Sequence, residues 1–211
     1  MPRSPEPARQ KILDTALRLF AERGVAAVSL REIRIEADQR NAGALQYHFG
    51  TKDGLLRALL ERELPPLVAR RRALLAIAAA GPADDSRAVA AVFVRPFAEL
   101  ATGNAREQSL ILLLSDLHND VSLALDQIMD LVGDTAATDA GKLMRARIAH
   151  VPPAILNERL IVANSVFLNA AALRARGGVR ERLLDDKTFQ ENLVDMFHGA
   201  ISVAAKTGLV S

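Results

Sequence analysis

The chain contains no cysteine. This absence excludes disulfides, thiolate catalysis and zinc sites with cysteine ligands. No apolar run approaches the ~20 residues that a helix needs to cross a bilayer. The first ten residues, MPRSPEPARQ, lack the apolar centre of a secretory signal. We therefore expect a cytoplasmic protein without a membrane-spanning segment.

A large excess of charge of one sign is also missing. The 211 residues carry 27 lysines and arginines against 25 aspartates and glutamates, a formal net charge of +2. Such a balance permits nucleic-acid binding without demanding it. Half of the residues are hydrophobic, so the chain can bury a substantial core, either in one domain or in a small domain joined to a larger one.

Strand-like alternation of β-branched residues is nearly absent, and turn clusters are few. We therefore predict an all-α fold. The expected helices cover about 7–23, 29–37, 40–47, 51–80, 86–101, 105–118, 137–150, 153–176 and 188–206, with 119–129 left ambiguous. The adjacent Pro65 and Pro66 predict a kink or a break in the long fourth helix, because each removes a backbone donor and clashes with the preceding turn.

Helix start and stop signals are clear near the N-terminus. Gly24 supplies the left-handed residue that ends the first helix. Ser29 and Glu32 have the spacing of a capping box at the start of the second helix. Thr51 is placed to cap the fourth helix, where Asp53 favours the positive end of the helix dipole.

Three short helices therefore precede a long one, and a tight turn joins the second helix to the third. This is the spacing of a helix-turn-helix unit, in which the second helix of the pair enters the major groove of DNA. The expected reading helix is RNAGALQYHF. Arg40 and Asn41 at its start would reach bases or phosphates, whereas Leu45 and Phe49 would point into a small core. Lys52, at the start of the next helix, adds positive charge to free N–H groups that can bind a phosphate.

Two segments, ILDTALRLFAERGVAAVSLREI and GALQYHFGTKDGLL, resemble the N-terminal DNA-binding domain of TetR-family regulators. The resemblance covers about Arg9 to Leu60, and beyond it extends only to length and helical layout. It implies a ligand-responsive homodimeric repressor that binds a palindromic operator in double-stranded DNA. Residues 1–54 would form the three-helix DNA-binding domain, and residues 55–211 a helical bundle for dimerisation and for a small-molecule effector. The expected DNA contacts, with Arg40 added from its place at the helix start, are Ser29, Arg31, Arg40, Asn41, Ala42, Gln46, Tyr47, His48, Thr51 and Lys52.

Two features depart from the family pattern. The turn EADQRNAG is one residue longer than usual, and Asp38 is the residue that can adopt the left-handed conformation there. Its carboxylate would oppose phosphate binding unless Arg34 or Arg40 neutralises it. Gln46 stands where the family often has an aromatic residue. Asp38 also favours an alternative hypothesis, a ligand-binding or protein-interaction module that has lost DNA binding.

The rest of the chain carries an expected pocket and an expected dimer interface. Ordinary bundle core explains the candidate pocket residues equally well; they are Phe93, Phe97, Leu112, Leu113 and Phe167. The last two helices of each subunit would form the dimer interface as a four-helix bundle. The helix that begins at Pro153 favours this arrangement, because it is apolar on more than one side.

No catalytic motif, glycine-rich phosphate loop or metal-ligand spacing is present. We therefore predict neither a cofactor nor a metal, and an enzyme built on a helical bundle is the least favoured alternative. Asp116, His118 and Asp120 are interpreted as a charged helix end exposed to water. The run Arg70–Arg72 is interpreted as a solvated face or as the edge of the pocket.

Overall fold

Helices make up the regular structure of the protein in a computed structural model, which describes residues 5–39, 43–119, 134–177 and 184–205. No strand occurs within these ranges, and the predicted all-α fold is confirmed. The helices are α1 (Pro5–Arg23), α2 (Leu30–Glu36), α3 (Gly43–Phe49), α4 (Lys52–Ala80), α5 (Ser86–Thr102), α6 (Ala105–Asn119), α8 (Ala136–Arg147), α9 (Pro153–Ala175) and α10 (Asp186–Ser202).

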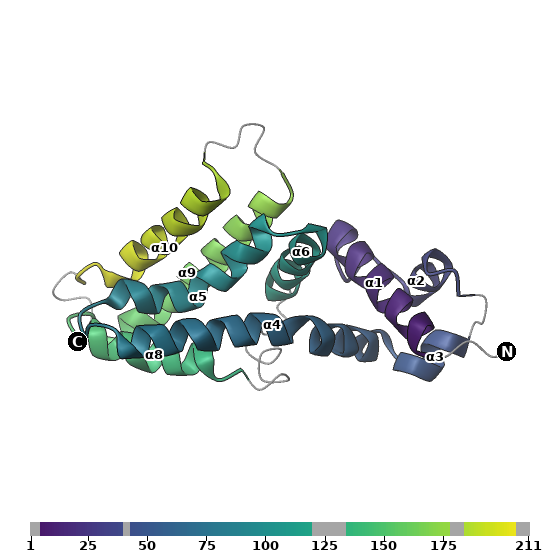
Figure 1. Cartoon of the computed structure of the whole chain (residues 1–211), viewed down its shortest axis with the longest axis horizontal. Coiled ribbons are helices and arrows are strands. Elements are labelled where there is room, and N and C mark those ends of the chain that lie inside the picture. Colours follow the sequence, from purple (N-terminus) through teal and green to yellow (C-terminus); the bar gives the residue numbers. More distant parts are fainter. Residues whose placement is uncertain (1–4, 40–42, 120–133, 178–183, 206–211) are drawn as a thin grey trace.

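The long helix α4 joins two groups of helices (Figure 1). The short helices α1, α2 and α3 lie at its N-terminal end, whereas α5 and α8 pack against the rest of it. α9 and α10 pack in turn against α5. α6 lies beside α1 and also contacts α5 and α9, so it connects the two groups a second time.

A cluster of buried apolar side chains extends through both groups. It contains Phe20 of α1 and Ile33 of α2, which are fully buried, together with Leu59 of α4 and Leu114 of α6. The expected domain boundary after residue 54 therefore crosses a continuous core. The N-terminal helices are not held by α4 alone, because α6 shares their hydrophobic contacts.

A second cluster lies among α5, α8, α9 and α10. Its aromatic centre is Phe197 of α10, which stacks on Phe93 at 5.6 Å between ring centroids and meets Phe167 edge-on at 5.4 Å. Aromatic pairs in these geometries contribute more than their buried area alone. The cluster thus fixes how α5, α9 and α10 pack around one another.

Of the kink or break expected at Pro65 and Pro66, the break is wrong, because α4 runs without interruption through both residues. Both prolines lie on the exposed side of the helix, where backbone carbonyls that lose a helical donor can bond to water. Leu64 and Leu67, directly beside them, are buried in the first cluster. Burial of these neighbours keeps the chain helical where local preference alone would end it.

The end of α8 also differs from the prediction. The helix stops at Arg147 and not at His150. Ile148 and Val151 are buried in the second cluster, and a residue before proline, such as Val151, disfavours helical geometry. His150 lies beyond the helix and donates from Nε2 to the carbonyl of Ser202 (2.7 Å).

Gly24 ends α1 in the predicted left-handed conformation, with a φ of +81°. α6 approaches closely at this point, because a Cβ built on Gly24 would lie 3.0 Å from Oδ1 of Asp116. The other oxygen of Asp116 accepts a hydrogen bond from the N–H of Val25 (2.8 Å). The glycine therefore allows α6 to bond to the backbone that follows α1.

Replacing Gly24 with alanine should destabilise the protein, because the left-handed φ is unfavourable for a residue with a Cβ and this Cβ presses on Asp116. We expect the free energy of unfolding, measured by urea denaturation, to fall by about 1–2 kcal/mol. Gly141→Ala in α8 is the matched control, since a Cβ there meets only Arg145 at 4.0 Å. That variant should gain about 0.5–1 kcal/mol. A Gly24→Ala protein as stable as the wild type would contradict this account.

Candidate nucleic-acid interface

α3 presents a polar and aromatic face that the described part of its own chain does not cover. Gln46 and Tyr47 are exposed, Tyr47 with 85% of its surface accessible, and His48 is half-buried. The Tyr47 ring meets the His48 ring edge-on, with 5.2 Å between centroids. These side chains leave donors, acceptors and aromatic edges available to a partner.

The opposite side of α3 is anchored in the first hydrophobic cluster. Leu45 is buried there together with Phe20 and Ile33, and Phe49 packs against the same cluster. The guanidinium of Arg9 lies over the Phe49 ring, 5.6 Å from its centroid. The small core predicted for the helix-turn-helix unit is thereby confirmed.

The start of α2 is closed by the predicted capping box. Ser29 Oγ accepts from the N–H of Glu32 (3.2 Å), and the Glu32 carboxylate accepts from the N–H of Ser29 (2.8 Å). Arg23 pairs with the same carboxylate at 2.9 Å. The hydrogen bond from the Ser29 backbone, followed by those from the Ser29 hydroxyl and Arg23, lowers the pKa of Glu32 to about 2. The neighbouring Arg31 remains exposed.

The start of α4 lies directly against the end of α3. Thr51 caps the helix as predicted, its hydroxyl accepting from the N–H of Gly54 (3.0 Å). A Cβ on Gly54 would lie only 2.1 Å from the carbonyl oxygen of Phe49, so no other residue fits without a shift of the backbone. Lys52 reaches toward the loop before α2, with Nζ 3.5 Å from the carbonyl oxygen of Ala26. The first turn of α4 is thus held beside both α2 and α3.

The turn between α2 and α3 contains the expected left-handed Asp38, with a φ of +53°. Arg34, one of the two residues that could neutralise this carboxylate, donates instead to the carbonyl of Gln39 (3.0 Å), and Arg40 lies outside the described residues. Lys11 of α1 is the nearest described cation, 3.9 Å from the Asp38 carboxylate. Both side chains are largely exposed, so this pair compensates the charge only weakly.

The predicted DNA-contacting residues that the structure describes lie on neighbouring elements at one end of the molecule (Figure 1). α2 carries Ser29 at its cap and Arg31 in its first turn. The remainder are Gln46, Tyr47 and His48 on α3, followed by Thr51 and Lys52 at the start of α4. Arg40, Asn41 and Ala42 lie outside the described residues.

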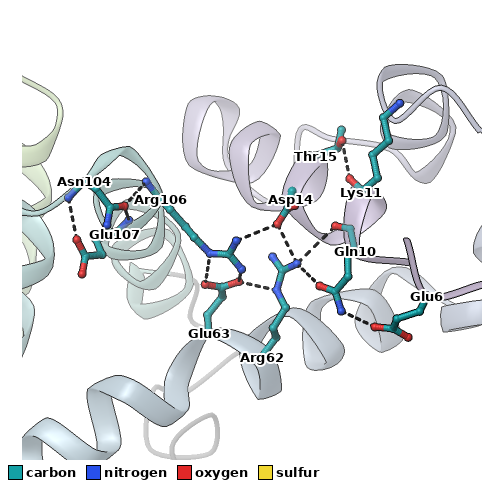
Figure 2. A network of polar contacts seen from close by, with 10 residues as sticks. All are labelled: Glu6, Gln10, Lys11, Asp14, Thr15, Arg62, Glu63, Asn104, Arg106 and Glu107. Carbon is teal, nitrogen blue, oxygen red and sulfur yellow. Dashed lines mark hydrogen bonds and ion pairs between the residues drawn. The ribbon is translucent and has the colours of Figure 1, made fainter. Parts of the chain in front are cut away.

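A network of ion pairs fastens α1 to α4 and α6 (Figure 2). Arg106 of α6 donates to the Glu63 carboxylate of α4 through Nε (2.9 Å) and Nη2 (2.6 Å). Arg62 donates to the same carboxylate (2.6 Å) and to the side chain of Gln10 on α1 (2.9 Å). Asp14 of α1 pairs with both Arg62 and Arg106, at 2.9 Å and 3.2 Å. The orientation of α1, and with it of α3, is therefore tied to α6.

Sequence reasoning missed this network. Adjacent opposite charges at Arg62 and Glu63 are the only local signal, and such pairs are usually solvated. The Glu63 side chain is instead 7% exposed, and its partner Arg106 is 43 residues away in the chain. No helical spacing rule connects residues so far apart.

The prediction that the charged end of α6 is simply exposed to water is wrong for Asp116 and His118. Asp116 bonds to the backbone of Val25, and His118 Nε2 lies 2.8 Å from the hydroxyl of Ser165 on α9. Asp120 lies outside the described residues. The C-terminal end of α6 thus links α1 to the bundle, while its N-terminal end carries Arg106.

The N-terminal part of this arrangement matches a known family. The model described as "Bacterial regulatory proteins, tetR family" matches residues 12–59, which run from α1 to the start of α4. Residues 12–59 therefore form an N-terminal domain of the TetR type. The family that this model describes consists of regulatory proteins, which speaks against the enzyme alternative.

Two curated relatives align with a segment of similar length. The HTH-type transcriptional repressor Rv3405c of Mycobacterium tuberculosis is 46% identical over 61 residues, which make up 29% of this chain and 32% of that protein. The HTH-type transcriptional repressor AcnR of Corynebacterium glutamicum is 39% identical over 59 residues, 28% of this chain and 31% of that protein. The similarity therefore spans about a third of the length of these relatives.

The whole fold also resembles a solved structure. The crystal structure of Mycobacterium smegmatis AmtR aligns with 94% of this chain and 90% of its own, with a TM-score of 0.55 and 23% identity. This likeness shows a shared fold that includes the C-terminal helices. None of the described helices is both long enough and apolar enough to cross a membrane.

A small cavity lies between α5 and α9. It has room for about one water molecule. Phe93, Phe97 and Phe167 of the predicted pocket line it, whereas Leu113 is buried in the first cluster and Leu112 is half-buried elsewhere. The remaining lining residues are Val94, Asn164 and Leu168.

The run Arg70–Arg72 is not a uniformly solvated face. Arg70 forms a bidentate pair with Glu99 of α5 (2.7 and 2.9 Å). Arg71 is buried, with 3% of its surface accessible, and pairs with the buried carboxylate of Asp134. The expectation of a solvated face is therefore wrong for Arg71.

The lowered pKa of Glu32 predicts a pH dependence of stability. Because the folded-state pKa of about 2 lies below the ordinary value of 4.5, the carboxylate stabilises the fold above about pH 4.5 and this stabilisation is lost as the pH falls toward 2. Glu32→Gln keeps a side chain suited to the capping box but removes the titration. We expect the Tm difference between wild type and Glu32→Gln to shrink between about pH 5 and pH 3. A constant difference over this range would contradict the assignment.

Proposed function

We propose that the chain is a DNA-binding transcriptional regulator that reads double-stranded operator DNA with α3. The observation that carries this proposal is the uncovered face of α3, where Gln46 and Tyr47 are exposed while Leu45 on the other side is anchored in the core. An amide and a phenol in the major groove can bond to base edges or phosphates. Arg40, Asn41 and Ala42, at the expected start of the reading segment, are proposed to make the remaining contacts with bases.

Phosphate contacts are proposed for the elements that flank α3. Ser29 and Arg31 lie at the start of α2, and Thr51 and Lys52 at the start of α4. Helix starts combine free N–H groups with the positive end of the helix dipole and so favour phosphate oxygens. We also assign His48, which is half-buried beside Tyr47, to contacts with DNA phosphates.

We further propose that the chain acts as a homodimer through α9 and α10. Val162, Val166 and Leu173 form an apolar stripe on α9, and each is at least half exposed. Met196 on α10 and Val203, directly after the end of that helix, are exposed in the same way. Apolar stripes of this kind on two adjacent helices suit a four-helix bundle between two copies. A dimer would place two reading helices about one DNA turn apart, ~34–36 Å, on the two halves of a palindrome.

Repression released by a small molecule is the proposed regulatory outcome. The two relatives named above are called repressors, which supports this direction. In the proposed division, residues 1–54 bind DNA in the cytoplasm, and residues 55–211 dimerise and hold the effector in the cavity between α5 and α9. An effector changes DNA affinity only through its different affinities for the two conformations of the dimer.

The alternative is a ligand-binding or interaction module that has lost DNA binding. The weakly compensated carboxylate of Asp38 beside the reading helix favours it. A gel shift with the DNA upstream of the chain's own coding sequence separates the two hypotheses. A retarded band that disappears when an excess of the same unlabelled DNA is added supports the regulator. If no protein–DNA complex forms even at low salt, the alternative is supported.

Replacing Lys52 with alanine should weaken binding to all DNA sequences alike, because a phosphate contact carries no base information. We expect the slope of log Kd against log salt concentration to become shallower by about one per site. Fluorescence anisotropy over a salt series measures it.

Lys142→Ala on α8 removes the same charge away from the proposed interface and should leave the slope unchanged. Gln46→Ala is the complementary comparison, because it should alter the preference among operator variants more than the slope. An unchanged slope for Lys52→Ala would refute the phosphate contact.

Replacing Val166 with glutamate should dissociate the proposed dimer, since a carboxylate buried in an apolar seam lacks a partner. We expect sedimentation to shift from dimer to monomer, and operator affinity to fall at least about tenfold, while helicity is kept. Ile77→Glu is the control, because Ile77 is an apolar residue on α4 that is at least as exposed as Val166. A Val166→Glu protein that remains dimeric would place the interface elsewhere.

A further inference from the structure

Arg9 of α1 carries a guanidinium that has no polar partner among the described residues. It lies over the Phe49 ring, 5.6 Å from the centroid, and no hydrogen bond or ion pair holds it within the described part of the chain. The other two arginines of α1, Arg18 and Arg23, pair with glutamates at 2.9–3.1 Å. Arg9 is half-buried, so the side chain is held in place while no described carboxylate pairs with its charge.

The contact with the ring prepares this arginine for an anion. A guanidinium over an aromatic face is attracted by the ring electrons, which leaves its N–H groups free for other partners. Its five N–H donors form a planar fork that matches two oxygens of a phosphate. Because the side chain is already ordered against Phe49, less conformational entropy remains to be lost when an anion binds.

Arg9 also continues the exposed face of α3 onto α1. The Phe49 ring lies 5.9 Å from the His48 ring, which meets the Tyr47 ring at 5.2 Å. These contacts form one row that runs from the exposed Tyr47 to the guanidinium. The N-terminal end of α1 lies next to α3 in Figure 1. A duplex that covers Tyr47 and His48 therefore has the cation of Arg9 at its edge.

We propose that Arg9 binds a phosphate of the operator backbone while its guanidinium stays on the Phe49 ring. Phosphate contacts carry no base information, but they fix the register and orientation of a protein on DNA. Because Phe49 is the last residue of α3, a phosphate held by Arg9 positions this helix in the groove from the side of α1. The inference rests on the function proposed above and adds α1 to the phosphate contacts of α2 and α4.

The rival explanation is a contact that only fastens α1 to α3. Arg9→Met separates the two, because it removes the charge and keeps a flexible apolar side chain over the ring. We expect its affinity to fall about tenfold, both for the upstream duplex of the gel shift and for an unrelated duplex of the same length. The slope of log Kd against log salt concentration should become shallower by about one per subunit. A wild-type slope overturns the proposal, even if the affinity falls.

Two further variants exclude a general effect of charge or stability. Arg18→Met is the matched control, because it removes the same charge from the same helix at a residue that pairs with Glu22 and Glu36, and its slope should be that of the wild type. Arg9→Lys keeps the charge but loses the planar fork, so it should keep the slope and lose part of the affinity. Circular dichroism checks that each variant is folded, and Arg9→Gln replaces Arg9→Met if the latter is not.

The phosphate itself is identified with upstream duplexes that carry one neutral methylphosphonate at a time. In the wild type, each substitution at a contacted phosphate should weaken binding. Arg9→Met should become insensitive at one position in each half-site and stay sensitive at the others, because both changes remove the same interaction. An identical set of sensitive phosphates in Arg9→Met and in the wild type refutes the assignment.

The two proposals fail in different ways. If the wild type binds neither duplex at low salt, the regulator is refuted and the phosphate contact of Arg9 with it. If the wild type binds DNA while Arg9→Met keeps its salt slope and its sensitive phosphates, only this inference is refuted.

Discussion

The position of α3, the proposed reading helix, depends on how α6 holds α1. The two helices share a hydrophobic cluster, and polar contacts fasten them at both ends. At one end Arg106 joins Glu63 and Asp14, and at the other Asp116 bonds to the backbone of Val25. Glu63 is a buried carboxylate, so its charge is tolerable only while its arginine partners remain in place. Movement of α6 would therefore disturb both the core and the ion pairs together.

This constraint gives the C-terminal bundle a direct mechanical connection to the proposed DNA surface. α6 contacts α5 and α9, which line the cavity, and it also contacts α1, whose core carries α3. A ligand bound in this cavity would contact the same two helices. Coupling of this kind requires that the bundle packs differently with and without the ligand, since packed cores do not deform continuously.

Local signals in the sequence were sufficient for most of the fold. The capping box of Ser29, the cap of Thr51 and the left-handed Gly24 all depend on bonds or angles within a few residues, and the structure has each of them. The break expected at Pro65 and Pro66 is absent, because contacts between helices and not local signals decide the structure there. Local preference opposes the helix there, but burial of Leu64 and Leu67 against other helices outweighs it.

The sequence by itself determined where most of the helices lie and which short segment carries the exposed polar face, because periodicity and capping act within one or two turns. Only the tertiary structure decided the partners of the charged residues. Arg71 and Glu63 look like ordinary surface charges in the chain, yet both are buried. The acceptor of Arg71 is Asp134, 63 residues away. Contacts over such distances follow from how the helices pack, and no local pattern encodes them.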